Sequence, residues 1–209
     1  KIIKTPSFSK KEEDVVKILE SWFRENGIDH KRHLNNLWAE NTYFNKNRPT
    51  ILLNSHHDTV QPNKSFTIDP FYPNEKDGKI FGLGSNDAGG ALVSLLNVFK
   101  SIYLKQNMKY NFIIACTAEE EIAGANGIKS ILEKLPKIDF AIIGEPTLMK
   151  LSIAERGLIV FDAKIKGKPG HAAHENKNNA IEKLPEIINW FNQLKFDRVS
   201  KLLGPVKTT

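Results

Sequence analysis

Apolar residues along the chain follow two patterns that alternate with each other. Helical spacing of apolar residues occurs from Val15 to Phe23, from Ala91 to Phe99 and over residues 179–194. Between these stretches lie apolar runs that are too short for helices and that end at polar residues; they are Ile51–Leu53, Asn111–Cys116 and Phe140–Ile143. Strands that alternate with helices in this way predict an α/β fold, with a mostly parallel sheet and helices on both of its faces.

Local signals add detail to this outline. Ser9 followed by Glu12 matches a capping box, so we expect the first helix to start there and to end at Asn26-Gly27. A short edge-type strand is expected at Asn36–Glu40, and a further helix at about 126–135.

The pattern changes after Met149. Residues 158–165 alternate as a strand does, the turn 166–170 follows, and the helix 179–194 comes next. We therefore predict two domains, residues 1–150 and residues 151–209, the second of α+β type.

Composition narrows the class of protein. The chain has 209 residues, 40% of them hydrophobic and 26% charged, which is ordinary for a soluble globular protein. Its formal charge of +6 comes from scattered lysines without a basic and aromatic block, so we expect no nucleic-acid partner. The apolar runs are far shorter than the roughly 20 residues of a membrane helix. One cysteine, Cys116, permits no intrachain disulfide, which favours the cytoplasm, and its apolar neighbours indicate a core residue.

Imidazole and carboxylate groups stand at the predicted carboxyl ends of the strands. His56 and Asp58 follow the first strand, the triplet Glu119–Glu121 follows the next, and Glu145 follows Phe140–Ile143, while Asp87 lies in a glycine-rich turn before a helix. Each segment alone has an ordinary explanation: a polar loop, a helix cap or a solvated acidic run. Together, at one edge of a parallel sheet, they predict a hydrolytic metal site.

Five motifs resemble the di-zinc metallopeptidase and amidohydrolase family of aminoacylase, acetylornithine deacetylase and succinyl-diaminopimelate desuccinylase. The motifs are His56-x-Asp58, the segment from Asp69-Pro70-Phe71 through Gly82-x-Gly84-x-x-Asp87-x-x-Gly90, the glutamate triplet, Gly144-Glu145-Pro146-Thr147 and Gly170-His171. The resemblance spans the whole chain.

The resemblance implies a role for each motif residue. His56 and Glu145 would bind one zinc ion, Glu121 the other, and Asp87 would bridge the two. Asp58 would orient His56, and Glu120 would be the general base, which depends on aligning Glu119 with the family residue that precedes the pair. The implied cofactor is two Zn²⁺, with Co²⁺ or Mn²⁺ able to substitute.

The second domain of this family is a lid that also forms the dimer. Its histidine, His171 here, would reach the active site of the neighbouring subunit and stabilise the oxyanion. The family's last zinc ligand and its substrate-carboxylate groups lie beyond the point where this chain ends. We therefore expect a fragment that is inactive or badly impaired alone. His30, His33, His57 and His174 match no family role and are expected at the surface or behind the ligands.

The motifs around the triplet and Glu145 are most similar to acetylornithine deacetylase and to relatives acting on acetylcitrulline. The resemblance thus implies cytoplasmic hydrolysis of a small N-acyl amino acid in arginine biosynthesis. Succinyl-diaminopimelate desuccinylase and dipeptidase are alternatives within the family. A non-catalytic metal-binding module and a single-metal binding protein are alternatives of another class.

Overall fold

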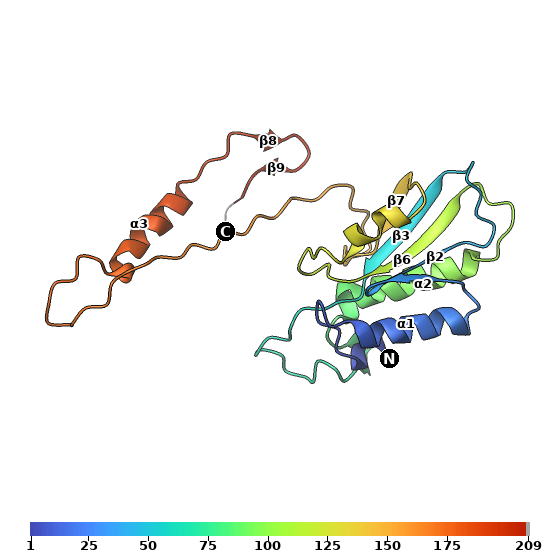
Figure 1. Ribbon diagram of the computed structural model, residues 1–209, viewed down its shortest axis with the longest axis horizontal. Helices are drawn as coiled ribbons and strands as arrows, with labels where there is room; N and C mark the ends of the chain where they lie inside the picture. Colours follow the sequence, from blue (N-terminus) through green and yellow to red (C-terminus); the bar gives the residue numbers. More distant parts are fainter. Residues whose placement is uncertain (208–209) are drawn as a thin grey trace. The chain divides into compact units, whose positions relative to one another are not determined.

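The computed structural model describes residues 1–207, and the chain divides into two compact units, Lys1–Met149 and a second that begins at Lys150. The first unit is a sheet covered by helices (Figure 1). It contains the strands and helices that carry all candidate metal-binding residues.

A five-stranded mixed sheet organises the first unit. Its strands are β1 (Lys31–His33), β2 (Asn36–Glu40), β6 (Asn111–Thr117), β3 (Thr50–His56) and β7 (Phe140–Ile143), in that spatial order. β3 lies between β6 and β7 and pairs with both in parallel, whereas β1–β2 and β2–β6 are antiparallel. The α/β class is confirmed, with a parallel part formed by β6, β3 and β7.

The sequence predicts an edge strand at Asn36–Glu40, but β2 lies inside the sheet, between β1 and β6. The edge on this side is β1, with the polar sequence Lys31-Arg32-His33. The residues of β2 are largely buried and those of β1 are largely exposed, so β1 has no apolar residues by which the sequence could reveal it. β2 therefore has four buried residues in succession.

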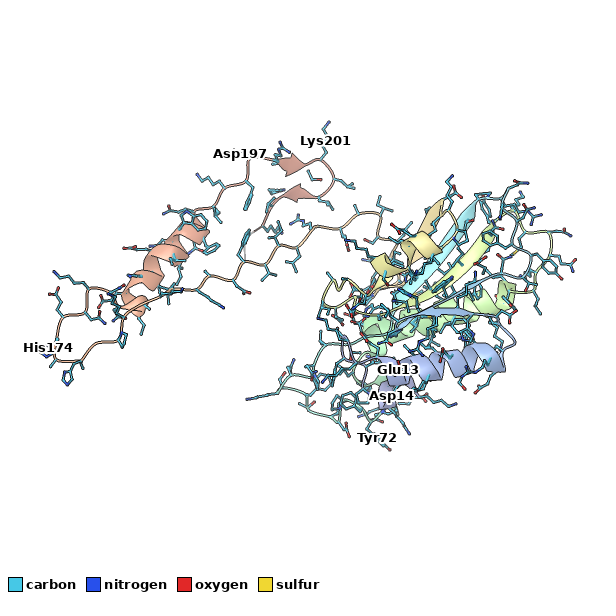
Figure 2. All side chains as sticks on the ribbon, in the orientation of Figure 1. Glu13, Asp14, Tyr72, His174, Asp197 and Lys201 are labelled. Carbon is cyan, nitrogen blue, oxygen red and sulfur yellow. The ribbon has the colours of Figure 1, made fainter. Side chains whose placement is uncertain are left out.

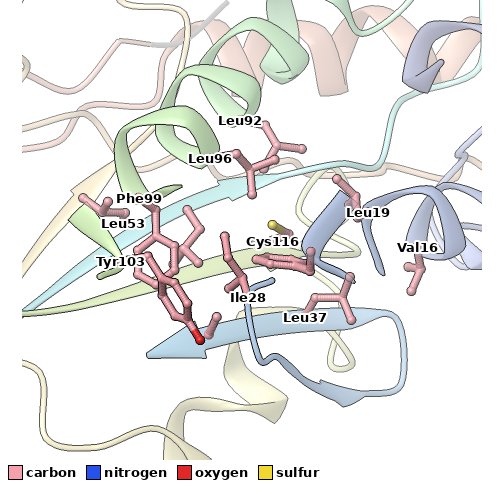
Figure 3. Packing of buried hydrophobic residues seen from close by; sticks show 13 residues of the cluster. Val16, Leu19, Ile28, Leu37, Leu53, Leu92, Leu96, Phe99, Tyr103 and Cys116 are labelled. Atoms are coloured by element: carbon pink, nitrogen blue, oxygen red, sulfur yellow. The ribbon is translucent and has the colours of Figure 1, made fainter. Parts of the chain in front are cut away.

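Helices α1 (Glu13–Glu25) and α2 (Gly90–Ile102) pack on one face of the sheet. Figure 3 shows the contact, with Leu92, Leu96 and Phe99 of α2 and Val16 and Leu19 of α1 facing the strands. Cys116 is buried in this cluster, as predicted, and burial raises the pKa of its thiol to about 12, so it remains an unreactive core residue.

The opposite face is covered by two short 3₁₀ helices, η3 (Ile128–Ser130) and η4 (Leu132–Lys134), in place of the single helix predicted over 126–135. Ile131 and Leu135 still pack against the sheet there. The carbonyl of Asn126 accepts hydrogen bonds from the side chains of Asn36 and Ser130, at 2.6 and 3.1 Å. Side-chain donors thus occupy an acceptor that an α-helix would need for its own backbone.

The first helix starts later than the sequence predicted. α1 begins at Glu13, its N-cap is Glu12, and the Glu12 side chain makes no capping hydrogen bond. Glu13 and Asp14 lie in the first turn, where their charges complement the helix dipole (Figure 2). The predicted end is confirmed: Asn26 is the C-cap and Gly27 has φ of +63°, in the left-handed region that favours glycine.

Three short elements complete the first unit. η1 (Ile2–Lys4) begins the chain, and β4 (Asn74–Lys76) forms a hairpin with β5 (Lys79–Phe81) inside the predicted long loop. The glycine-rich turn contains η2 (Ser85–Gly89), a single irregular helical turn in which Asp87 has extended φ and ψ angles. This turn leads directly into α2.

The second unit contains α3 (Ala180–Asn192) and a short pairing of β8 (Val199–Ser200) with β9 (Gly204–Pro205). Asn179 caps α3 by accepting a hydrogen bond from Ile181 N. The strand predicted over 158–165 is absent from the described residues, and Leu158 is 87% exposed. A strand requires a partner for its backbone groups, and residues 150–207 supply none to this segment.

Over residues 1–207, every helix is too short or too polar to cross a lipid bilayer.

Candidate metal centre

The parallel strands bring the candidate residues to one edge of the sheet. His56 is the last residue of β3, the glutamate triplet follows β6, and Glu145 follows β7. Asp87 comes from the turn before α2. Because the carboxyl ends of parallel strands meet at the same edge, the three strand ends converge there, and the turn before α2 brings Asp87 to them.

The predicted convergence on His56 is present in the structure. His56 Nε2 lies 3.0 Å from an Asp87 oxygen, 3.8 Å from Glu120 Oε2 and 3.9 Å from Glu145 Oε1. One donor atom from each of His56, Asp87 and Glu121 lies within 4.8 Å of the other two, a spacing that suits ligands of one ion or of two ions that share Asp87. The geometry therefore gathers all four predicted ligands and the predicted base around one imidazole.

Asp58 lies behind this cluster and is fully buried. One of its carboxylate oxygens is 3.3 Å from His56 Nδ1, and its backbone carbonyl is 3.0 Å from the same nitrogen. The carboxylate also accepts hydrogen bonds from the backbone N–H groups of Glu120 and Glu121, at 3.1 and 3.2 Å. With Nδ1–H directed at Asp58, the Nε2 lone pair of His56 faces the other carboxylates, which is the tautomer a metal ligand requires.

Charge in the cluster is unbalanced without a cation. Burial, and then the negative charge of Asp87, raise the pKa of Glu121. Burial also raises the pKa of Glu145, where the charges of Glu120 and then Asp87 add to it against the opposite effect of His56. Burial by itself lowers the pKa of His56, but hydrogen bonds to Asp58 and Asp87 outweigh it and raise that pKa to about 9. The site thus favours uptake of protons, and a divalent cation would supply the same positive charge. The donor set of imidazole and carboxylates fits zinc.

Glu119 points away from the cluster. Its carboxylate accepts hydrogen bonds from Asn126 Nδ2 and N, and its φ of +53° marks the place where the chain turns after β6. This position is consistent with the alignment that leaves Glu120 and Glu121 for the metal centre.

His57 is buried among residues behind the centre. Its Nε2 lies 2.9 Å from the carbonyl of Asn35, and burial lowers the pKa of the ring to about 4, so the imidazole is neutral. His171 belongs to the second unit, where its Nδ1 accepts a hydrogen bond from Ala173 N. The oxyanion role implied for His171 stays a prediction.

The two buried histidines predict an unusual pH profile for the metal-free protein. A raised folded-state pKa at His56 contributes stability that is complete below its ordinary value of 6.5 and is lost as the pH rises through about 9. The loss has an upper limit of roughly 3 kcal/mol, from about 1.4 kcal/mol per pKa unit. The lowered pKa of His57 acts in the opposite direction, so the contribution of His57 to stability should rise between about pH 4 and 6.5, against the opposing ionisation of Glu121 and Glu145.

Urea unfolding from pH 4 to 9.5, with chelator or with zinc, measures this profile. Zinc binds neutral imidazole, so the alkaline loss should disappear in the zinc-loaded protein. The variant His56→Asn should remove the same loss, and His33→Asn, at a half-buried histidine of β1, serves as the control. Constant stability of the metal-free protein above pH 6.5 would contradict the role assigned to His56.

Residues 52–196 match the model of the family described as peptidase family M20/M25/M40. The chain is 34% identical over 169 residues to a succinyl-diaminopimelate desuccinylase of Rickettsia typhi, covering 74% of this chain and 44% of that protein. It is 36% identical over 140 residues to an acetylornithine deacetylase of Buchnera aphidicola, covering 66% of this chain and 36% of that protein. The chain thus spans less than half the length of these relatives.

Among solved structures, the chain resembles an M20 family metallo-carboxypeptidase, Sso-CP2, from Sulfolobus solfataricus. The TM-score is 0.56 at 23% identity, and the match covers 68% of this chain and 35% of that one. This likeness supports the fold.

An α/β unit that gathers a histidine and several carboxylates at the carboxyl ends of its parallel strands defines a class of metal-dependent hydrolases. Within that class, the match over residues 52–196 is specific: the chain belongs to the peptidase family M20/M25/M40.

Proposed function

We propose that the whole protein containing this chain hydrolyses the amide bond of a small N-acyl amino acid with the help of two bound zinc ions. The observation that carries the proposal is the convergence of these side chains. Donor atoms of His56, Asp87 and Glu121 lie within 4.8 Å of one another. The carboxylates of Glu120 and Glu145 lie 3.8 and 3.9 Å from His56 Nε2. When bound, the two ions lower the pKa of a water molecule and polarise the amide carbonyl.

In this proposal the chain's residues divide the work. His56, Asp87, Glu121 and Glu145 would hold the metal ions, and Asp87 would serve both. Its position 3.0 Å from His56 and within the same group as Glu121 supports the shared role.

Glu120 is the proposed general base. Its carboxylate is 53% exposed and lies 3.8 Å from His56 Nε2, so it borders the metal centre and remains open to substrate. There it would accept a proton from the attacking water and deliver it to the leaving amine. The Asp58 carboxylate holds the Glu120 backbone N–H, which supports a fixed position for this base.

Removal of an acetyl group from N-acetylornithine or N-acetylcitrulline is the reaction we propose first, on the motifs around Glu121 and Glu145. Succinyl-diaminopimelate desuccinylation is a second candidate, favoured by the relative from Rickettsia typhi that bears this name. The two reactions cleave the same kind of bond and differ in the acyl group, so the metal centre serves both.

Amine release from N-acetylornithine, N-acetylcitrulline and N-succinyl-diaminopimelate by the whole protein distinguishes these candidates. We expect turnover of one acetylated substrate, loss of turnover after dialysis against a chelator and recovery with Zn²⁺ or Co²⁺. Metal analysis should give about two ions per chain, as the two-metal mechanism requires. Faster release from the succinylated substrate selects the second candidate, and release from none of the three would contradict the proposal.

The second unit has a proposed role of its own, as a lid and dimerisation domain that supplies His171 to a neighbouring subunit. Loss of turnover in His171→Ala, restored by mixing with an inactive Glu120→Gln partner in heterodimers, would support it.

A further inference from the structure

Ser9 and Glu12 match a capping box in sequence, yet neither side chain caps α1. Both reach instead to residues distant in the chain, at the carboxyl ends of β3 and β6. Ser9 Oγ donates a hydrogen bond to Asp58, across 49 positions, and Glu12 accepts one from Glu119 N, across 107 positions. A local helix-start motif thus contributes its polar atoms to the metal centre's support.

Ser9 completes the hydrogen bonding of the Asp58 carboxylate. The hydroxyl donates to Oδ2 at 2.7 Å, the same oxygen that accepts from Glu121 N, while Oδ1 accepts from Glu120 N and faces His56 Nδ1. Because Asp58 is fully buried, water cannot replace a lost contact, and without Ser9 the Oδ2 atom keeps one N–H donor and holds the carboxylate less firmly. Any movement of this carboxylate would shift Glu120, Glu121 and the His56 ring together.

Glu12 supports the residue at which the chain turns. Its side chain is completely buried, with Oε1 accepting from Lys10 N at 2.7 Å and from Glu119 N at 3.3 Å. Oε2 accepts from Asn35 Nδ2 at 2.8 Å. Glu119 has a φ of +53°, a conformation that a residue other than glycine adopts only when its surroundings impose it. Glu12 is one such constraint, directly before the two glutamates of the metal centre.

The backbone of the same segment is attached to β3's end. Thr59 N donates to the carbonyl of Ser7 at 2.9 Å, and Phe8 forms a parallel bridge with Thr59. We call residues 7–12 the N-terminal brace. It contacts the chain after β3 through backbone and Ser9, and the chain after β6 through Glu12.

We propose that Ser9 and Glu12 are positioning residues, which hold the segments after β3 and β6 in the mutual geometry that metal binding and proton transfer require. The inference rests on the proposed function for its kinetic part. Its metal-binding part stands on the contacts alone.

Outer contacts to ligand-orienting groups are worth about 10- to 100-fold in metal affinity or activity. A displacement of about 1 Å at a catalytic group can cost on the order of 100-fold in rate. We therefore expect Ser9→Ala to lower kcat about 10- to 100-fold with KM changed less than about threefold, because Ser9 contacts no substrate. Metal affinity should fall by a similar factor.

The experiment compares Ser9→Ala, Ser9→Thr and Glu12→Gln with the wild type, all in the whole protein. Three sets of measurements are made: kcat and KM, Co²⁺ affinity together with the visible spectrum of the Co²⁺-loaded protein, and the melting temperature of the metal-free protein. Ser9→Thr keeps the hydroxyl and should restore the wild-type rate and spectrum. Ser21→Ala removes a hydroxyl that bonds to Glu25 within α1, and it should leave all three unchanged.

A wild-type spectrum, affinity and kcat in Ser9→Ala, with only a lower melting temperature, would reduce the brace to a purely structural role and overturn the inference. If Ser9→Ala does not fold, the Glu12→Gln variant tests the inference instead. The glutamine amide keeps the shape of the side chain and one acceptor oxygen, so this variant is expected to fold. An unchanged Co²⁺ spectrum in that variant would also overturn the inference. The spectrum and affinity need no substrate, so failure of every substrate tested would count against the proposed function and leave the inference to be judged on metal binding.

Discussion

Replacing Glu120 with glutamine is expected to lower turnover by the metal-loaded protein about 10²- to 10⁴-fold, the range that a general base contributes. Glutamine matches glutamate in shape but cannot accept the proton of the attacking water. The backbone N–H that binds Asp58 is retained, so the loop after β6 should keep its place. Metal content should therefore stay at the wild-type level.

Steady-state kinetics and metal analysis of the same preparations measure this result. Glu133→Gln is the matched control, because Glu133 is an exposed glutamate of η4, on the far face of the sheet. A wild-type rate in Glu120→Gln would remove Glu120 from the mechanism and direct attention to Glu121. A non-catalytic metal-binding module would show no turnover in either protein.

Glu121→Gln is expected to weaken metal binding without destabilising the metal-free fold. Glu121 shares its donor cluster with His56 and Asp87, so loss of its charge should lower affinity by more than the 10- to 100-fold typical of outer contacts. In the metal-free protein, the same substitution should raise the stability of the fold or leave it unchanged. Burial and then Asp87 raise the pKa of Glu121, so its ionised form opposes folding at neutral pH, and a neutral amide relieves that opposition.

Zinc titration and urea unfolding of the metal-free protein test both halves of this prediction. Affinity should fall while the free energy of unfolding at pH 7 is equal to, or above, that of the wild type. Glu120→Gln is the neighbouring control and should retain affinity. A lower stability of metal-free Glu121→Gln would show that the carboxylate supports the fold itself, contrary to a role reserved for the metal.

The strands of the first unit were largely predictable because each is a short apolar run with clear polar limits. β2 coincides with the predicted Asn36–Glu40, and β7 coincides with Phe140–Ile143. β1 was missed because its three residues are polar and largely exposed. Only the backbone pairing with β2 makes this segment a strand, and that pairing leaves no apolar pattern in the sequence. The segment 158–165 shows the converse: strand-like alternation predicts a strand only where a partner exists.

The candidate residues of the metal centre could also be proposed from the sequence, because carboxylates and a histidine that cluster at several strand ends are costly unless a cation or a shared proton offsets their charge. Their convergence on His56 followed from parallel pairing of β3 with β6 and β7. The sequence left His57 open between the surface and a position behind the ligands, since a histidine between His56 and Asp58 carries no sign of its own burial; the structure buries it.

By itself, then, the sequence determined the class of fold, the kinds of donor atoms and the strand ends at which they lie, because periodicity and residue chemistry are local properties. Only the tertiary structure decided how Ser9 and Glu12 are used. Their spacing favours a helix cap when neighbours in the chain are considered alone. In the folded chain, Asp58 binds the Ser9 hydroxyl and Glu119 N binds the Glu12 carboxylate. These contacts replace the hydrogen bonds that the two side chains would make to the start of the helix. Such long-range partners are fixed by packing of the sheet and are invisible in the spacing of residues along the chain.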